Sequence, residues 1–281
     1  MGEEMTAALE LPDTTTELGA ALGLALAACD EADALSLASF RQEIKVETKA
    51  DDSFVTAADR AVEEAIRLRV AARFPDHGLV GEEYGERPSG SGRRWIIDPI
   101  DGTHNYMRGV PIFATLLALE IRGELALGVV SAPALRRRWF SWRGGGAWAV
   151  DLVPGGWVRA SATRLSVSAI SEPGEASIVY SSLASIVQSG LAPGFVDLLA
   201  AAWRDRGLGD FYGYVLVAEG AAEAMIEAEL KIWDLAAPRA VLEHAGGRCS
   251  DLRGGSDMPA KGVLASNGLV HDTMLAALGG D

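Results

Sequence analysis

The chain has 281 residues, enough for one large domain or two closely packed halves with a sizeable core. Its 39 acidic and 25 basic side chains give a net charge of −14, which argues against a nucleic-acid or anionic membrane partner. The two cysteines, Cys29 and Cys249, lie far apart without a C-x-x-C spacing, so they indicate neither a disulfide scaffold nor a zinc site. The N-terminal stretch is acidic, and the apolar run Ala20–Cys29 is too short to cross a bilayer. We therefore expect a cytoplasmic protein.

The first part of the chain predicts two helices and a strand. Apolar residues at helical spacing indicate a helix from about Thr15 to Phe40. A second helix is expected to begin at Thr56, which can cap its N-terminus with Asp59 three positions on, and to stop at Pro75. The apolar run at Trp95 then predicts a strand.

The pattern changes at residue 113. Short β-like runs separated by glycines predict an antiparallel meander from Phe113 to Ala149. After it, strand-like and helical segments alternate, which is typical of an α/β arrangement. The expected strands are Ala176–Ser181 and Gly262–Ser266, and the expected helices are Leu191–Trp203, Val215–Ala224 and Leu235–Ala245. We place the division between the halves within residues 151–165, giving an N-terminal half of 1–155 and a C-terminal half of 156–281.

Trp95–Tyr106 reads W-I-I-D-P-I-D-G-T-H-N-Y and is the most informative segment of the chain. It places Asp98 and Asp101 beside a Gly102-Thr103 turn, directly after the strand. Carboxylate oxygens are ligands that Mg²⁺ prefers, and Mg²⁺ is usually held by a few carboxylates together with substrate phosphate. If a helix opens after Gly102, its free N–H groups favour an anion there. The segment therefore predicts a site where metal ions face a phosphate.

The acidity of the protein makes metal part of this hypothesis. Carboxylates in an acidic protein repel phosphate until bound cations reverse the local charge. A phosphate-binding site built on Asp98 and Asp101 therefore requires metal.

Further acidic residues have an ordinary alternative. Asp234 is placed to start a helix in which Pro238 would occupy the first turn, and Asp59 also lies at a helix start. Aspartate is strongly preferred as a helix cap, so either residue could serve only as a cap. Glu82 and Glu83 could be a solvated acidic pair. Asp98 is harder to explain in this way, because a carboxylate at the end of an apolar strand has no capping function.

Four ordered motifs together resemble the inositol monophosphatase family of metal-dependent phosphatases. They are V-T-A-A-D at Val55–Asp59, G-E-E at Gly81–Glu83, the D-P-I-D-G-T block, and W-D-L-A-A followed by E-H-A-G-G from Trp233. Three further segments are similar to the bacterial, especially actinobacterial, histidinol-phosphate phosphatases of this family. They are Gly128–Leu135, Leu216–Glu223 and Ala265–Asp272.

The resemblance implies a fold, an activity and a set of site residues. The fold would be a layered αβαβα sandwich of the inositol monophosphatase and fructose-1,6-bisphosphatase type, of mixed α+β and α/β class. The protein would be a homodimer that hydrolyses a small phosphate monoester with two or three Mg²⁺ ions per site. The resemblance places the metal ions on Glu82, Asp98, the carbonyl of Ile100, Asp101 and Asp234, the phosphate on Gly102 and Thr103, and the nucleophilic water on Asp59 and the Thr103 hydroxyl.

Substrate choice depends on residues of the second half. The resemblance places Glu227 at the part of the substrate beyond the phosphate, with Asp210 and Arg206 as further candidates. Acidic side chains there would suit the amine and imidazole of histidinol phosphate. Alternatively, Asp210 and Arg206 form a surface ion pair. An inositol-1-phosphate phosphatase, a non-catalytic family member and a structural Ca²⁺ site remain alternatives for the whole protein.

Two groups of residues near the meander are expected to be structural. The run Arg136-Arg137-Arg138 predicts a solvated strand or hairpin face. The cluster Trp139, Phe140, Trp142 and Trp148 indicates a core or a dimer interface, since a net acidic protein is a poor partner for nucleic-acid bases.

Overall fold

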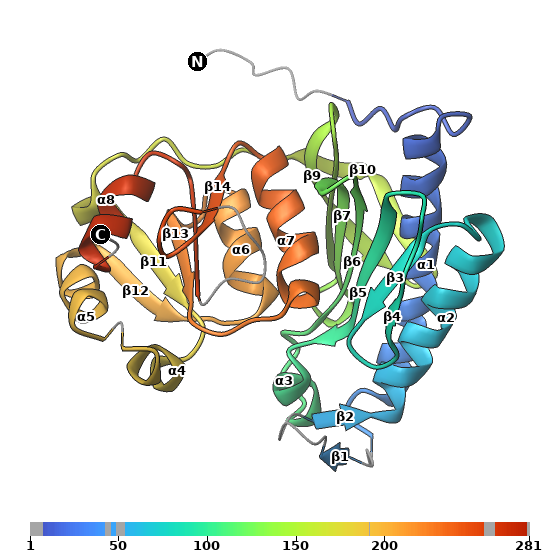
Figure 1. Cartoon of the computed structure of the whole chain (residues 1–281), viewed down its shortest axis with the longest axis horizontal. Helices are drawn as coiled ribbons and strands as arrows, with labels where there is room; N and C mark the ends of the chain where they lie inside the picture. Colours follow the sequence, from blue (N-terminus) through green and yellow to red (C-terminus); the bar gives the residue numbers. More distant parts are fainter. Residues whose placement is uncertain (1–7, 43–45, 49–53, 191, 256–261, 280–281) are drawn as a thin grey trace.

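The computed structural model describes residues 8–42, 46–48, 54–190, 192–255 and 262–279. Helices and sheets alternate in layers across the molecule (Figure 1). Helices α1 and α2 cover one face of an eight-stranded sheet, and α6 and α7 lie between that sheet and a five-stranded sheet. Helices α5 and α8 lie on the outer side of the second sheet. This layered α and β arrangement confirms the fold expected from the sequence. No helix within the described ranges has the length and apolarity needed to cross a membrane.

Both helices of the outer layer begin close to their predicted starts, and the cap predicted at Thr56 is confirmed. Helix α1 spans Glu17–Ser39, and the Thr16 hydroxyl accepts a hydrogen bond from the N–H of Gly19. Helix α2 spans Ala57–Arg73, and Thr56 and Asp59 form a reciprocal capping box at its start. The expected apolar positions of α2 are buried, so this helix packs on the sheet through one face.

The first sheet contains the predicted meander. Its order is β10-β9-β8-β7-β6-β5-β3-β4, and all neighbours are antiparallel except β3 and β5. The strands are β3 (Gly78–Gly81), β4 (Gly85–Arg87), β5 (Arg93–Asp101), β6 (Ala114–Ile121), β7 (Glu124–Ala132), β8 (Arg137–Trp142), β9 (Gly146–Val153) and β10 (Gly156–Arg164). A two-stranded sheet of β1 (Val46–Thr48) and β2 (Phe54–Thr56) precedes α2. The four aromatic residues of β8 and β9 are buried, which confirms their place in the core.

The second sheet has the order β12-β11-β13-β15-β14. Its strands are β11 (Ser177–Tyr180), β12 (Arg204–Gly207), β13 (Ala224–Glu227), β14 (Arg248–Asp251) and β15 (Val263–Ser266). The helices of this half are α4 (Leu183–Gln188), α5 (Ala192–Ala201), α6 (Phe211–Ala218), α7 (Ile232–His244) and α8 (His271–Ala277).

Because β10 pairs with β9, the chain leaves the first sheet only after Arg164. The division at residue 155 stays a prediction.

Two predictions for the middle layer were wrong. The helix expected at Val215–Ala224 begins earlier and ends at Ala218, because Gly220 adopts a left-handed conformation with φ 72° and reverses the chain before β13. Pro238 was expected in the first turn of its helix but is the seventh residue of α7. Since proline has no N–H, the carbonyl of Asp234 receives no main-chain hydrogen bond from this position.

The prediction that all three arginines of the run 136–138 are solvated was also wrong. Arg138 is fully buried and its guanidinium forms ion pairs with Asp30 and Asp33, both at 2.8 Å. Arg138 Nε also donates to the Ser131 hydroxyl at 2.9 Å. Side chains alternate between the two faces of a strand, so Arg137 and Arg138 point in opposite directions and Arg138 meets α1.

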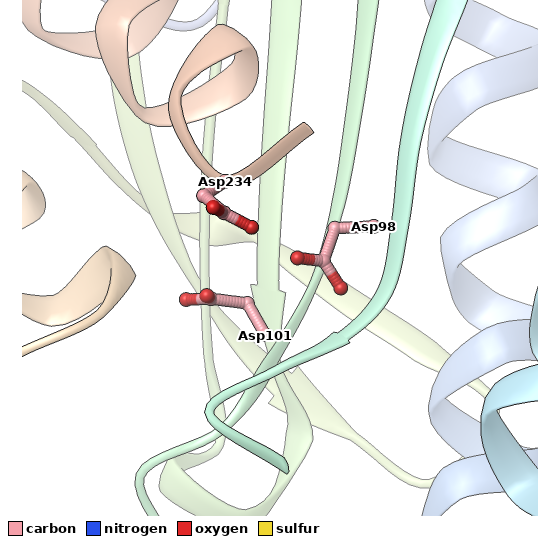
Figure 2. A group of neighbouring side chains, drawn as sticks. All are labelled: Asp98, Asp101 and Asp234. Carbon is pink, nitrogen blue, oxygen red and sulfur yellow. The ribbon is translucent and has the colours of Figure 1, made fainter. Parts of the chain in front are cut away.

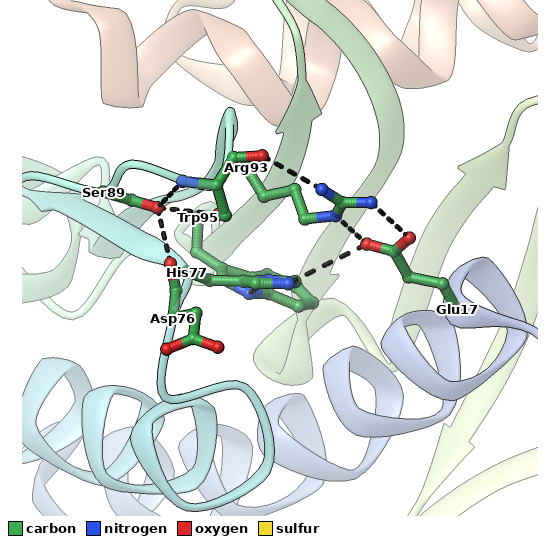
Figure 3. A network of polar contacts seen from close by, with 7 residues as sticks. Glu17, Asp76, His77, Ser89, Arg93 and Trp95 are labelled. Carbon is green, nitrogen blue, oxygen red and sulfur yellow. Dashed lines mark hydrogen bonds and ion pairs between the residues drawn. The ribbon is translucent and has the colours of Figure 1, made fainter.

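A polar network holds the start of β5 against the outer helices (Figure 3). Arg93 donates to the Glu17 carboxylate at the start of α1. The indole N–H of Trp95 donates to His77 Nδ1 at 3.1 Å, and the His77 ring stacks on Phe74 at the end of α2. These contacts tie both helices to the strand that carries Asp98 and Asp101.

Candidate active site

A β-bulge near the end of β5 separates Asp98 from Asp101. Asp98 pairs with Leu116 of β6 and Asp101 pairs with Ala114, so β5 has one residue more than its partner. In a regular strand, two residues three positions apart point to opposite faces. The extra residue lets both carboxylates reach the same pocket. Pro99 lies within the bulge, where a residue without an N–H is tolerated.

Asp234 approaches this pair from the second half of the chain (Figure 2). It is the third residue of α7, and its Oδ2 accepts the N–H of Lys231 at 2.5 Å. Asp98, Asp101 and Asp234 each offer a carboxylate oxygen, and these oxygens lie within 4.8 Å of one another. Asp98 Oδ1 is buried and has no hydrogen-bond partner. Three converging carboxylates with an unsatisfied oxygen form a site that can hold a cation.

The electrostatics of the cluster point to the same conclusion. Burial raises the pKa of Asp98 well above its ordinary value, and the neighbouring charges of Glu82, Asp101 and Asp234 raise it further. Burial is also the main cause that raises the pKa of Asp101 and that of Asp234. A bound divalent cation would offset this repulsion and return the carboxylates to their charged form.

Asp59 lies at the start of α2, with one oxygen satisfied and one not. Its Oδ2 accepts hydrogen bonds from the N–H and the hydroxyl of Thr56, whereas Oδ1 is buried without a partner. Burial raises the pKa of Asp59 to about 6, although the bonds from Thr56 act in the opposite direction. The charge of Asp59 adds to the field that raises the pKa of Asp98.

The cluster lines a pocket of about 380 Å³. Most predicted site residues lie on its wall, and so do His104 and Glu229, to which the sequence analysis assigned no role in the site. The predicted ones are Glu82, Asp98, Ile100, Asp101, Gly102, Thr103, Asp210, Glu227 and Asp234. Of the remaining two, Asp59 lies at the start of α2 and Arg206 lies on β12.

The Gly102-Thr103 turn has the predicted form. Helix α3 (Thr103–Met107) begins directly after Gly102, which adopts a left-handed conformation with φ 79°. A Cβ on Gly102 would lie 3.0 Å from the Ile112 carbonyl oxygen and 3.2 Å from Asp210 Oδ2. The Thr103 hydroxyl donates to the carbonyl of Ile100 at 2.9 Å. The first-turn N–H groups of α3 have no partner within the helix.

A second pocket joins the first. It shares His104, Asp210, Glu227 and Glu229 with the acidic pocket and adds the three serines 181, 182 and 185. Glu227 ends β13 and is buried, and the Tyr214 hydroxyl donates to its Oε2 at 2.7 Å. Burial raises the pKa of Glu227 to about 8.

Asp210 and Arg206 do not form the ion pair considered as an alternative. Asp210 Oδ2 accepts a hydrogen bond from Asn105 Nδ2 at 3.2 Å, and the exposed Arg206 donates to the carbonyl of Asp205 at 2.6 Å. Asp210 therefore belongs to the pocket wall, whereas Arg206 is not among the residues that line either pocket.

Sequence analysis missed Ser181, Ser182 and Glu229, because they belong to none of its motifs. They follow the carboxyl ends of the parallel strands β11 and β13. Ligands of α/β sheets bind at such edges, so an accurate assignment of both strands would have indicated these residues. The sequence predicted β11 but not the four-residue β13.

Comparison with known proteins agrees with the fold. The model of the Inositol monophosphatase family matches residues 17–279. The histidinol-phosphatase of Mycobacterium tuberculosis is 45% identical over 259 residues, which are 92% of this chain and 97% of that protein. The histidinol-phosphatase of Streptomyces coelicolor is 43% identical over 262 residues, covering 92% and 96%. The solved structure of the extragenic suppressor protein suhB from Bartonella henselae is 27% identical, with a TM-score of 0.82 and coverage of 92% and 98%.

The chain therefore belongs to the inositol monophosphatase family. It is a phosphatase of the phosphoric monoester hydrolase class, and members of this family depend on metal ions. Its substrates are small phosphate-bearing molecules.

Proposed function

We propose that the protein is a Mg²⁺-dependent phosphatase that converts L-histidinol phosphate and water to L-histidinol and phosphate, a reaction of histidine biosynthesis. The observation that carries the proposal is the convergence of Asp98, Asp101 and Asp234 beside a second pocket with acidic walls. The 45% and 43% identity to two histidinol-phosphatases supports this choice of substrate.

The residues present fit a hard divalent cation. The cluster offers only oxygen ligands, and Asp98 retains a buried oxygen without a partner. We assign two or three Mg²⁺ ions per site to Glu82, Asp98, Asp101, Asp234 and the carbonyl of Ile100. Bound Mg²⁺ would neutralise the carboxylates, acidify a bound water and offset the charge of the phosphate.

Asp59 and Thr103 are assigned to the attacking water. A pKa of about 6 leaves Asp59 mostly ionised at neutral pH, so Oδ1 can take a proton from water. Because the Thr103 hydroxyl donates to Ile100, its oxygen is left to accept a hydrogen bond from the same water. The water oxygen bonds to phosphorus as the ester P–O bond breaks, and the leaving alkoxide takes a proton from solvent. No covalent phospho-enzyme is required.

The phosphate and the alcohol part have separate places. We assign the phosphate to the main-chain N–H groups after Gly102, which have no partner within helix α3. The alcohol part would occupy the second pocket, where Asp210, Glu227 and Glu229 suit the ammonium and imidazolium groups of histidinol phosphate. A substrate contact for Arg206 stays a prediction, and its exposed position on β12 gives no support to it.

The main alternative substrate is inositol 1-phosphate. The serine hydroxyls of the second pocket would suit a polyol, and the family is named for inositol monophosphatases. Nothing supports the non-catalytic role, because every predicted metal-binding residue lines the pocket and the relatives are phosphatases. A cytoplasmic location and a homodimer remain predictions.

Phosphate release from a substrate panel tests the proposal. The panel contains histidinol phosphate, inositol 1-phosphate, fructose 1,6-bisphosphate and adenosine 3′,5′-bisphosphate, each with Mg²⁺ and with EDTA. We expect the highest kcat/KM for histidinol phosphate, and only with Mg²⁺. A higher kcat/KM for inositol 1-phosphate would identify that compound, and not histidinol phosphate, as the preferred substrate. Undiminished turnover in EDTA would reject the metal-dependent mechanism.

A further inference from the structure

Glu63 is a fully buried carboxylate outside the acidic pocket. It lies in the second turn of α2 and accepts hydrogen bonds from three donors. Its Oε2 accepts the N–H of Glu83 at 2.7 Å, and its Oε1 accepts the N–H of Tyr84 at 3.2 Å and Arg67 Nε at 2.7 Å. Two of these donors are main-chain groups of the loop between β3 and β4.

Arg67 holds the other end of the same loop. Its Nη2 donates to the carbonyl of Gly85, while its Nε is paired with Glu63. Gly81 and Gly85 face each other across the β3–β4 hairpin, so only residues 82–84 form the loop. The Glu63–Arg67 pair therefore binds main-chain groups of residues 83, 84 and 85 from one turn of α2.

Gly81 allows this close approach. A Cβ at this position would lie 2.1 Å from Glu63 Oε1 and 2.5 Å from its carboxyl carbon. Because the carboxylate is fixed by three donors, it cannot move away without losing them. The glycine before Glu82 thus lets α2 press its carboxylate directly against the loop.

The loop carries Glu82, whose side chain lines the acidic pocket. We propose that Glu63, supported by Arg67, is a positioning residue that holds the loop so that the Glu82 carboxylate reaches the metal ions. The inference rests on the proposed role of Glu82 as a metal ligand. In a loop of three residues, the main chain on either side of Glu82 decides where its side chain points.

The substitution Glu63→Gln tests this role with little change in volume. A carboxamide has one acceptor oxygen in place of two, so its NH₂ group would face either a loop N–H or Arg67. Loss of such supporting hydrogen bonds typically weakens metal binding by about 10- to 100-fold. We expect a Mg²⁺ dissociation constant raised by about this factor, measured by calorimetric titration of Mg²⁺ into protein treated with EDTA. Excess Mg²⁺ should restore most of kcat, because the ligands themselves are unchanged.

The matched control is Glu64→Gln, the same chemical change at the next, exposed position of α2. It should leave the Mg²⁺ dissociation constant unchanged. If Glu63 serves only the fold, Glu63→Gln will lower the melting temperature in EDTA without changing Mg²⁺ affinity, and the inference is then wrong.

Gly81→Ala is a second, independent test that keeps every polar group. The added Cβ should push the loop away from Glu63 and weaken Mg²⁺ binding in the same direction. Glu82→Gln separates the two hypotheses. Unchanged Mg²⁺ affinity in Glu82→Gln would reject the proposed ligand set. Weaker binding in Glu82→Gln but not in Glu63→Gln or Gly81→Ala would reject only the positioning role.

Discussion

Asp59 and Asp234 each divide their two carboxylate oxygens between a helix and the pocket region. Oδ2 caps the first turn of α2 in Asp59 and of α7 in Asp234. The other oxygen is unpaired in Asp59, and Asp234 belongs to the metal-binding cluster. Capping and site chemistry had been considered as alternatives for both residues, but one carboxylate has enough acceptor positions for both. The cap also fixes the rotamer, which holds the second oxygen in place.

Asp98 is the residue whose loss should matter most for catalysis. Asp98→Asn keeps the volume but removes the negative charge and one ligand oxygen. We expect kcat to fall by at least about 100-fold at saturating Mg²⁺, with circular dichroism unchanged. Asp151→Asn, which alters an exposed ion pair with Arg137, is the control and should keep normal turnover. A folded Asp98→Asn enzyme with near-normal kcat would remove Asp98 from the mechanism.

Glu229 and Glu227 should act on substrate recognition. Replacing Glu229 by glutamine removes a charge that would bind a cationic group of histidinol phosphate. Glu227 has a pKa of about 8 in the free protein, and its replacement removes a carboxyl group that a bound cationic group would keep ionised. Hydrogen bonds to charged groups contribute about 1.5–3 kcal/mol, so we expect KM to rise by about tenfold or more with little change in kcat. Steady-state kinetics with histidinol phosphate and a neutral polyol phosphate measure the effect.

Only the cationic substrate should lose affinity in these variants. Glu175→Gln, at an exposed position of a short 3₁₀ helix, is the matched control. An equal rise in KM for both substrates would indicate a disturbed pocket. An unchanged KM would show that neither glutamate takes part in substrate recognition.

At the scale of single elements, α1 and β8 are joined by an ion pair in the core. Arg138 is fully buried, with Asp33 nearly so, and burial raises the pKa of Asp33 despite the opposing effect of Arg138. Such a pair requires both partners, because an isolated buried charge is costly.

Arg138→Met should therefore strongly destabilise the fold. It leaves Asp30 and Asp33 without their cation, and we expect the free energy of unfolding to fall by about 3–5 kcal/mol. Urea denaturation provides the measurement. The matched control is Arg137→Met on the same strand, where the partly exposed pair with Asp151 should contribute no more than about 1 kcal/mol. Equal losses in the two variants would contradict the structural role assigned to Arg138.

At the scale of the whole molecule, the site lies where the two sheets and the middle helices meet. Asp98 and Asp101 come from the first sheet, Asp234 from α7 and Glu227 from the second sheet (Figure 1). The core that joins these layers contains apolar residues of both sheets and of α6 and α7. Packing between layers thus brings the carboxylates together, and their repulsion in the metal-free protein opposes that packing.

Burial of these carboxylates, together with their repulsion, predicts that the metal-free protein loses stability as pH rises. The pKa of Glu227 is raised from 4.5 to about 8, so its contribution is complete below about pH 4.5 and is lost as pH rises through 8. The lowered pKa of His271, about 4, acts in the opposite direction, but only below about pH 6.5. Between pH 6.5 and values above 8, Glu227 alone should cost about 2 kcal/mol of unfolding free energy.

Urea unfolding in EDTA across this range tests the prediction. Glu227→Gln, which has no titrating group, should lose less stability than the wild type over the same interval. Saturating Mg²⁺ should stabilise the protein more at pH 8 than at pH 6.5, because metal ions bind the deprotonated carboxylates. A metal-free stability that rises with pH above 6.5 would contradict the assignment.

Local sequence patterns predicted most elements correctly. They failed where contacts between residues far apart in the chain determine the structure. The cap at Thr56 and the meander follow from neighbouring residues, so the sequence indicated them. The end of α6 depends on Gly220, whose left-handed conformation is one of several that glycine adopts. The burial of Arg138 depends on Asp30 and Asp33 across the sheet, and no local pattern shows that partnership.

The sequence by itself determined the chemical types in the site: the acidic side chains, the glycine turn and the helix caps, because these depend on covalent structure and near neighbours. Only the tertiary structure decided which of them converge. The bulge in β5 directs Asp98 and Asp101 to one pocket, and packing between the layers adds Asp234 to it. Glu229 lines the same pocket because it follows the carboxyl end of β13. Convergence depends on contacts between residues far apart in the chain, and such contacts form only when the layers have packed.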